Sequence, residues 1–227
     1  MKKQMLPLLA GAMLMIATSA MAVQVAVPTL SLYDGTTTIV VTDGGAGDLN
    51  PISGAVTYLG PIGNWNLNVS TGLSDPLLGP LGFPHMELNS VNASTAPGTL
   101  QIMWTDTGFT AVVPGFSTLV GGTLANGATA NFQTWLDSGN AAFGLTTQLA
   151  NMNFGPGGAF SGTTDTAAAT GSLFSMTEVA TLTHTSAGGS SFDLEVTPVP
   201  EPGTMVLLGV GMAGLVIFGK RRMNKEA

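Results

Sequence analysis

The residues best suited to chemistry lie in one acidic, glycine-rich segment, residues 43–50. Asp43 and Asp48 supply two carboxylates, and Asn50 adds an amide oxygen. A Ca²⁺ ion takes about six to eight oxygen ligands from groups of this kind and from backbone carbonyls. The segment therefore predicts a calcium site, although its spacing is not that of an EF-hand. The commoner role of Asp and Gly in such a segment is turn geometry alone, with no cofactor bound.

Catalytic residues are much harder to assemble from this sequence. The chain has no cysteine, and its two histidines, His85 and His184, are far apart. No G-x-S-x-G nucleophile elbow occurs. We therefore expect no enzymatic activity. The alternative is an exported hydrolase with an unrecognised active site, which would need a cleft where His85 or His184 meets a Ser and an acid.

Three tryptophans are candidates for stacking on sugar rings: Trp65, Trp104 and Trp135. Carbohydrate binding requires at least one of them to be exposed. Each lies in a predicted strand, where a place in the core is the commoner outcome.

All six basic residues lie at the two ends of the chain. The interval 4–219 holds no Lys or Arg but contains twelve of the thirteen acids. No Lys or Arg salt bridge can form there, and the field of the middle region is uniformly negative. Nucleic acid is therefore excluded as an expected partner, because its binding depends on cationic side chains.

The middle region, residues 23–197, has the pattern of short strands broken by turn residues, with no convincing helical period. The run 65–70 alternates, which predicts that Trp65, Leu67 and Val69 face a core. About nine or ten short strands need two packed sheets or a barrel, so we expect an antiparallel β-sandwich, with a jelly roll as one form of it. A long loop is expected at 73–84. The predicted strands are 30–33, 36–42, 65–70, 99–105, 117–120, 128–136, 146–154, 178–185 and 191–196.

The N-terminus has the three parts of a secretory signal peptide, predicted at residues 1–22. Lys2 and Lys3 precede an apolar run at 5–17, and Ala20 and Ala22 are small residues at the positions that signal peptidase reads. The apolar run would rise only about 20 Å as a helix, which is short for a bilayer.

The C-terminus predicts a membrane anchor. A Pro-rich stalk at 198–202 is followed by an uncharged apolar run at 203–219 and a basic tail at 220–227. The run would rise about 25 Å as a transmembrane helix. The basic cluster predicts that the tail lies in the cytoplasm and the middle domain outside it.

The same tail resembles the PEP-CTERM sorting signal. The resemblance rests on the motif Pro200, Glu201 and Pro202, the apolar run, and the cluster Lys220, Arg221 and Arg222. It implies a Gram-negative host and processing by exosortase, a membrane-embedded protease, often in bacteria that make exopolysaccharide. Tails of this type are also labelled after ice-binding proteins, which describes the tail and not the domain.

Together these features predict an exported protein, anchored first in the inner membrane and then placed at the cell surface or in a biofilm matrix. The expected partners are exosortase, the membrane and exopolysaccharide. The middle domain is expected to act structurally or through weak polysaccharide binding. The alternatives are a hydrolase and a calcium-dependent adhesion module.

Overall fold

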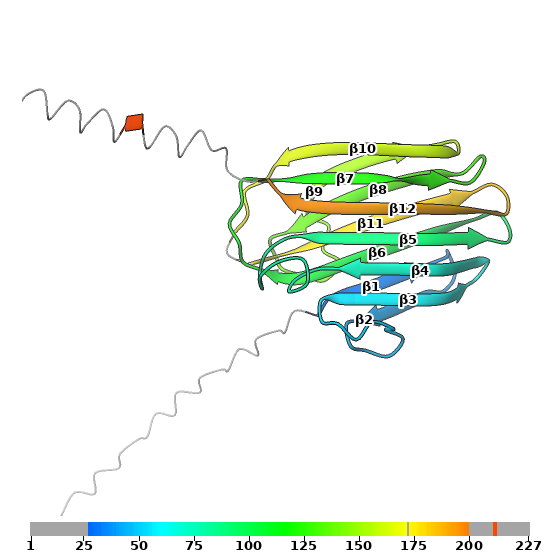
Figure 1. Ribbon diagram of the computed structural model, residues 1–227, viewed down its shortest axis with the longest axis horizontal. Coiled ribbons are helices and arrows are strands. Elements are labelled where there is room, and N and C mark those ends of the chain that lie inside the picture. Colours follow the sequence, from blue (N-terminus) through cyan, green and yellow to red (C-terminus); the bar gives the residue numbers. More distant parts are fainter. Residues whose placement is uncertain (1–26, 172, 200–210, 213–227) are drawn as a thin grey trace, which may run out of the picture.

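Short runs of alternating residues, rich in Thr and Val, form twelve antiparallel strands that make two six-stranded sheets packed face to face (Figure 1). This computed structural model describes residues 27–171, 173–199 and 211–212. Sheet A has the order β2 (Thr38–Thr42), β1 (Thr29–Tyr33), β6 (Gly98–Phe109), β11 (Phe174–His184), β8 (Thr129–Asp137) and β9 (Thr147–Phe154). Sheet B has the order β10 (Gly158–Ala167), β7 (Gly115–Leu124), β12 (Gly188–Pro198), β5 (Met86–Ser94), β4 (Trp65–Leu73) and β3 (Ala55–Ile62).

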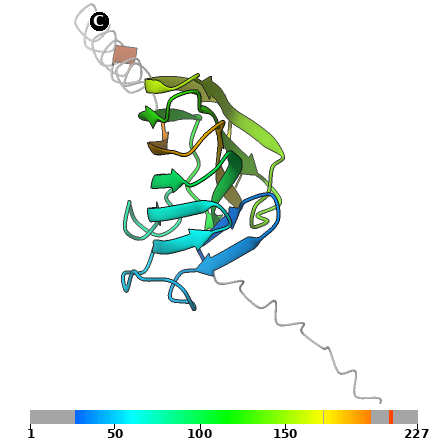
Figure 2. The ribbon, with the colours of Figure 1, turned by 90° about the vertical axis from the view of Figure 1, so that its right-hand side faces the viewer.

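The strands from β5 to β12 have jelly-roll topology. The chain crosses between the sheets repeatedly, so that β5-β12-β7-β10 in sheet B faces β6-β11-β8-β9 in sheet A, with β10 against β9 and β7 against β8. The β1–β2 hairpin extends sheet A beside β6, and the β3–β4 hairpin extends sheet B beside β5. Figure 2 shows the two layers from one end. The predicted β-sandwich is confirmed, in its jelly-roll form.

The core lies between the sheets and is built from alternate residues of each strand. Trp65 and Leu67 are buried, as the alternation predicts. The side chain of Val69 lies outside what the structure describes, so its inward position stays a prediction. A β-bulge between Leu67 and Val69 shifts the pairing with β5. After the bulge Ser70 takes the next buried position, where its hydroxyl hydrogen-bonds Ser90.

Three strands were not predicted: β3, β5 and β10. The predicted loop at 73–84 is confirmed, between β4 and β5. The structure places it at 74–85.

The two layers touch closely where Trp104 of β6 lies over Gly72 of β4. A Cβ atom built on Gly72 would lie 2.2 Å from Cδ2 of the Trp104 indole. A glycine at this position lets the indole fill the space between the sheets. The indole Nε1 also donates to Leu73 O at 3.0 Å.

The change Gly72→Ala is expected to destabilise the domain by about 3 kcal/mol, because the new methyl group would force the indole out of its place in a close-packed core. Urea unfolding followed by Trp fluorescence measures the effect. The matched control is Gly121→Ala on the outer side of β7, whose new Cβ would approach only Phe160 O, at 3.7 Å. Equal midpoints for the two variants would contradict the proposed packing.

The connections divide between the two ends of the sandwich because successive strands run in opposite directions. Both ends of the described domain, Val27 and Val199, lie at one end, which we call the tail end (Figure 1). Val199 N donates there to Gly115 O at 2.9 Å. The loops at the tail end are 43–54, 74–85, 110–114, 138–146 and 168–173. The loops at the far end are 34–37, 63–64, 95–97, 125–128, 155–157 and 185–187.

Candidate functional site

The outer face of sheet A presents a field of hydroxyl and amide side chains. Strand alternation turns every second residue of β6, β11, β8 and β9 outward, and the pairing registers bring these residues side by side. The one acid of this set, Asp137 at the end of β8, is buried, so the open part of the face carries no charge. Met103 and Val179 are apolar members of this outward set. The other open positions are Thr99 and Gln101, Thr181 and Thr183, Thr129, Asn131, Gln133 and Trp135, and Gln148, Asn151 and Asn153.

Five of these side chains form a connected hydrogen-bond network, the amide ladder, made of Asn131, Gln133, Gln148, Asn151 and Asn153. Asn131 Nδ2 donates to Asn151 Oδ1 at 2.6 Å and to Asn153 Oδ1 at 2.9 Å. Gln133 Nε2 donates to Asn131 Oδ1 at 2.6 Å, and Gln148 Nε2 donates to Gln133 Oε1 at 3.3 Å. These bonds fix the carboxamide planes, so the ladder presents its remaining donors and acceptors in set directions.

Trp135 joins the amide ladder, unlike the other two tryptophans. Trp65 and Trp104 are buried in the core. Trp135 lies on the outer face, half-buried, and its indole Nε1 donates to Gln133 Oε1 at 3.0 Å. A partly exposed indole held beside amide groups offers an apolar ring face next to oriented polar groups.

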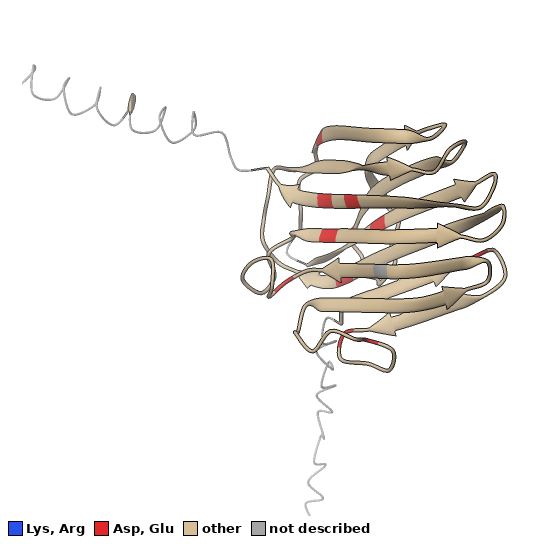
Figure 3. Cartoon of the chain, turned by 45° about the vertical axis from the view of Figure 1, so that its right-hand side comes forward, with Lys and Arg blue, Asp and Glu red and all other residues tan. Residues whose placement is uncertain are grey.

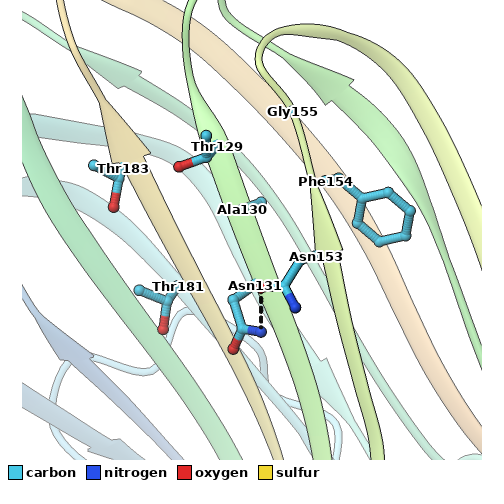
Figure 4. Close-up of a pocket in the computed structure, with 8 residues that line it drawn as sticks. All are labelled: Thr129, Ala130, Asn131, Asn153, Phe154, Gly155, Thr181 and Thr183. Carbon is cyan, nitrogen blue, oxygen red and sulfur yellow. Dashed lines mark hydrogen bonds between the residues drawn. The ribbon is translucent and has the colours of Figure 1, made fainter.

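A shallow hollow of about 320 Å³ crosses this face where β11, β8 and β9 run side by side (Figure 4). The side chains of Thr181, Thr183, Thr129 and Asn131 point from the strands toward the viewer in Figure 4, with Asn153 beside Asn131. A hollow this open does not enclose a small molecule. It suits a ligand that lies along the sheet.

One end of the outer face is covered by the β8–β9 loop, 138–146. Phe143 N donates to Thr105 Oγ1 at 3.0 Å, and Thr105 is buried. The Asp137 carboxylate accepts Ala141 N at 2.9 Å and Gly139 N at 3.2 Å. These backbone bonds, Ala141 first, lower the pKa of Asp137. The anchored loop leaves the amide ladder and the threonines as the open part of the face.

The outer face of sheet B has the opposite character. Glu87 of β5 and Asp193 and Glu195 of β12 lie together there as an acidic cluster, visible in red on the two strands in Figure 3. Burial raises the pKa of both Glu87 and Asp193, and neighbouring acids raise it further. This face would repel an anionic ligand.

The predicted calcium ligands Asp43 and Asp48 both hold turns in the 43–54 loop. Asp48 Oδ1 accepts Asn50 N and Thr57 N, each at 2.9 Å, and its Oδ2 accepts Gly44 N at 3.0 Å. Asp43 Oδ2 accepts Gly54 N at 2.8 Å. In the part of the chain that the structure describes, no three His, Asp or Glu side chains gather as a metal site. Calcium binding by Asp43 and Asp48 stays a prediction.

The two histidines are held by different kinds of partner. His184 is buried: its Nδ1 lies 2.8 Å from Ser94 Oγ, its Nε2 lies 2.7 Å from Ser190 Oγ, and its ring packs 4.5 Å from the ring of Trp65. His85 Nε2 lies 2.8 Å from Glu195 Oε1, and its Nδ1 lies 3.1 Å from Leu78 O. Neither ring has both a Ser and an acid among the partners that the structure describes.

Most of the predicted sorting residues lie outside the described part of the chain. These are Ala20 and Ala22 at the predicted signal cleavage site, and Pro200, Glu201, Pro202, Lys220, Arg221 and Arg222 in the tail. Of the predicted transmembrane run 203–219, only residues 211 and 212 are described. Within the described residues, no helix has the length and apolar character to cross a membrane.

Sequence comparison identifies the tail. Residues 198–222 match the family model of the PEP-CTERM protein-sorting motif, which confirms the resemblance. The motif supports an exported protein that has a membrane-anchored precursor and is sorted through exosortase. No curated protein matches the chain.

Among solved structures, the enzymatically active domain of the bacteriophage CBA120 tailspike protein 4 is similar over 76% of this chain, with 13% identity and a TM-score of 0.34. The match spans 19% of the tailspike chain. A likeness at that level carries no argument about function.

Proposed function

We propose that this PEP-CTERM protein presents a non-enzymatic β-sandwich at the cell surface or in the extracellular matrix, where the outer face of sheet A binds neutral polysaccharide. The observation that carries the proposal is the uncharged amide ladder beside the half-buried Trp135. The sorting motif supports the export that such a role requires.

The chemistry of the face matches that of a sugar chain. Hydroxyl groups of a polysaccharide donate and accept hydrogen bonds, and amide side chains offer both functions. The apolar faces of sugar rings pack on an indole. The shallow hollow along β11, β8 and β9 is open, so it leaves room for a chain longer than the site itself.

The charge pattern favours a neutral ligand over an anionic one. The interval 4–219 has no Lys or Arg to pair with a uronate or sulfate group, and the whole domain is negative. An uncharged face avoids most of the desolvation penalty that carboxylates would add to binding.

Replacing Asn131 and Asn153 together with Ala is expected to weaken binding of neutral oligosaccharides about tenfold, because two side-chain hydrogen-bonding groups are lost. Isothermal titration with neutral and uronate-containing oligosaccharides measures the effect. The matched control is Asn66→Ala/Asn89→Ala on the outer face of sheet B. The proposal is wrong if uronate oligosaccharides bind better than neutral ones, or if both double variants bind like the wild type.

A further inference from the structure

The exposed apolar side chains of the loops are gathered at one end of the sandwich. At the tail end, Leu81 and Val112 are 79% and 77% exposed. In the described residues, the six loops of the far end have no large hydrophobic side chain exposed to a comparable degree. The exposed aliphatic residues in the tail-end loops are Leu49, Ile52, Leu77, Leu81, Val112, Leu145 and Leu173.

Charge is nearly absent from the loops that carry these residues. Loops 110–114, 138–146 and 168–173 contain no ionisable side chain. Loop 74–85 contains Asp75 and His85, but Asp75 is buried and His85 contacts Glu195. The acids of loop 43–54 accept backbone N–H groups within that loop. Asp43 and Asp48 are half-buried, so the carboxylates of the tail-end loops are confined to loop 43–54. The loops without ionisable side chains can therefore approach a lipid headgroup layer.

The tail fixes which surface this end meets. The described domain leaves the tail end at Val199, and the apolar run of the sorting tail begins at Gly203. Four residues span at most about 14 Å even when fully extended. In the membrane-anchored precursor Val199 must therefore lie within that distance of the bilayer, which turns the tail end of the sandwich toward the lipid.

We propose that the tail-end loops dock onto the lipid bilayer in the anchored precursor, with Leu81, Val112 and Leu145 entering the interface. Aliphatic side chains at the headgroup boundary bind by burying apolar area, and each alone binds weakly. The short connection makes the binding effectively intramolecular, so weak contacts are enough. Anionic lipids are expected to weaken the contact, because the domain is negative.

The absence of cysteine allows a site-specific test. Full-length protein with Leu145→Cys, labelled with a fluorophore, is reconstituted into phosphatidylcholine vesicles that carry a headgroup quencher. The reference is the same label on Asn126→Cys, which lies in a loop of the far end. We expect about twofold or greater quenching at residue 145 relative to residue 126.

A longer linker distinguishes loops that bind the bilayer themselves from loops that the tail merely holds near it. Inserting about ten Gly/Ser residues after Val199 adds roughly 17 Å of reach. Docked loops keep their quenching with this linker, whereas loops that are merely tethered lose it. Leu81→Ser/Val112→Ser should abolish the quenching that remains. Val91→Ser/Leu119→Ser, on the outer face of sheet B, is the matched control and should not.

The inference is overturned if residue 145 is quenched no more than residue 126, or if the longer linker abolishes quenching while Leu81 and Val112 are intact. Contact that appears only after the sorting protease is added to the vesicles would also overturn it, because the partner would then be a protein. None of these outcomes depends on whether sheet A binds polysaccharide.

Discussion

Lowering the pH from 8 to 5 is expected to stabilise the folded domain, because two buried carboxyl groups take up protons in the folded state. Glu178 of β11 is fully buried between the sheets, and neither carboxyl oxygen has a hydrogen-bond partner in the described structure. Asp106 of β6 is buried, with Ser74 Oγ donating to it at 2.6 Å.

The surroundings of both groups disfavour the ionised form. Burial raises the pKa of Glu178 well above its usual value, and the nearby acids Glu87, Asp193 and Glu195 raise it further. Burial likewise raises the pKa of Asp106 to about 7. No Lys or Arg exists between residues 4 and 219 to neutralise either carboxylate.

The direction of the pH effect follows from proton uptake. Between the unfolded and folded pKa values only the folded state holds the proton, so each group adds about 1.4 kcal/mol of stability per unit of falling pH. This stability is complete below the unfolded pKa and is lost as the pH rises through the folded pKa. Asp106 alone should contribute about 3 kcal/mol between pH 8 and pH 5. His184, whose pKa burial lowers, opposes the trend as the pH falls below 6.5.

Thermal unfolding at pH 5, 6, 7 and 8 measures the effect at fixed ionic strength. The melting temperature should rise by on the order of 10–20 °C toward pH 5. Glu178→Gln should flatten the slope, and Glu178→Met should raise the melting temperature at pH 8, because neither residue can ionise. Asp165→Asn, at an exposed acid on β10, should retain the wild-type slope. A melting temperature that falls steadily from pH 8 to pH 5 would exclude this account.

The fold class could be predicted because it depends on composition and period. Strands such as β8 and β11 are rich in Thr and apolar residues and alternate, and both were predicted. β10 was missed because no side chain along it is fully buried, so the sequence has no apolar alternation to detect. β5 was missed because its inward positions include Ser90 and Asn92, which are polar.

The inward position of Glu178 could not be predicted from β11 alone. Alternation gives two sets of residues, one with Glu178 and Leu182, the other with Val179 and Thr181, and each contains an apolar residue. The pairing of β11 with β6 decides between them, since Glu178 lies opposite Trp104 on the core side. The cost of burying a carboxylate is avoided by proton uptake, which hydropathy does not represent.

To predict the amide ladder from the sequence, one further fact was needed: the register in which two neighbouring strands pair. β8 and β9 were both predicted. Asn131 and Gln133 alternate along β8 and Asn151 and Asn153 along β9, while a β-bulge beside Trp135 brings Gln148 to the same face. Their antiparallel pairing places Asn131 opposite Asn153 and turns these residues outward. Once β8 and β9 are taken as a hairpin, the shared outward amides are the signal that sequence reasoning could have used.

In cells that carry the sorting protease, the change Glu201→Ala is expected to block processing and leave the full-length protein in the membrane. Residues 198–222 match the PEP-CTERM motif, and Glu201 is the charged residue between its two prolines. Proline restricts the backbone on both sides of Glu201 to conformations that are not helical, which suits a protease cleft. The wild-type protein should lose residues 203–227, and the variant should keep them.

C-terminal mass spectrometry of the surface and membrane fractions distinguishes the two forms. The matched control is Glu226→Ala, which changes a glutamate of the same tail outside the matched motif and should be processed like the wild type. Deleting the protease should reproduce the Glu201→Ala result, because both remove the same recognition step. Wild-type protein that is exposed at the surface and still ends in Ala227 would show that the tail acts as a permanent anchor, since the basic cluster and the apolar run explain an anchor without any cleavage.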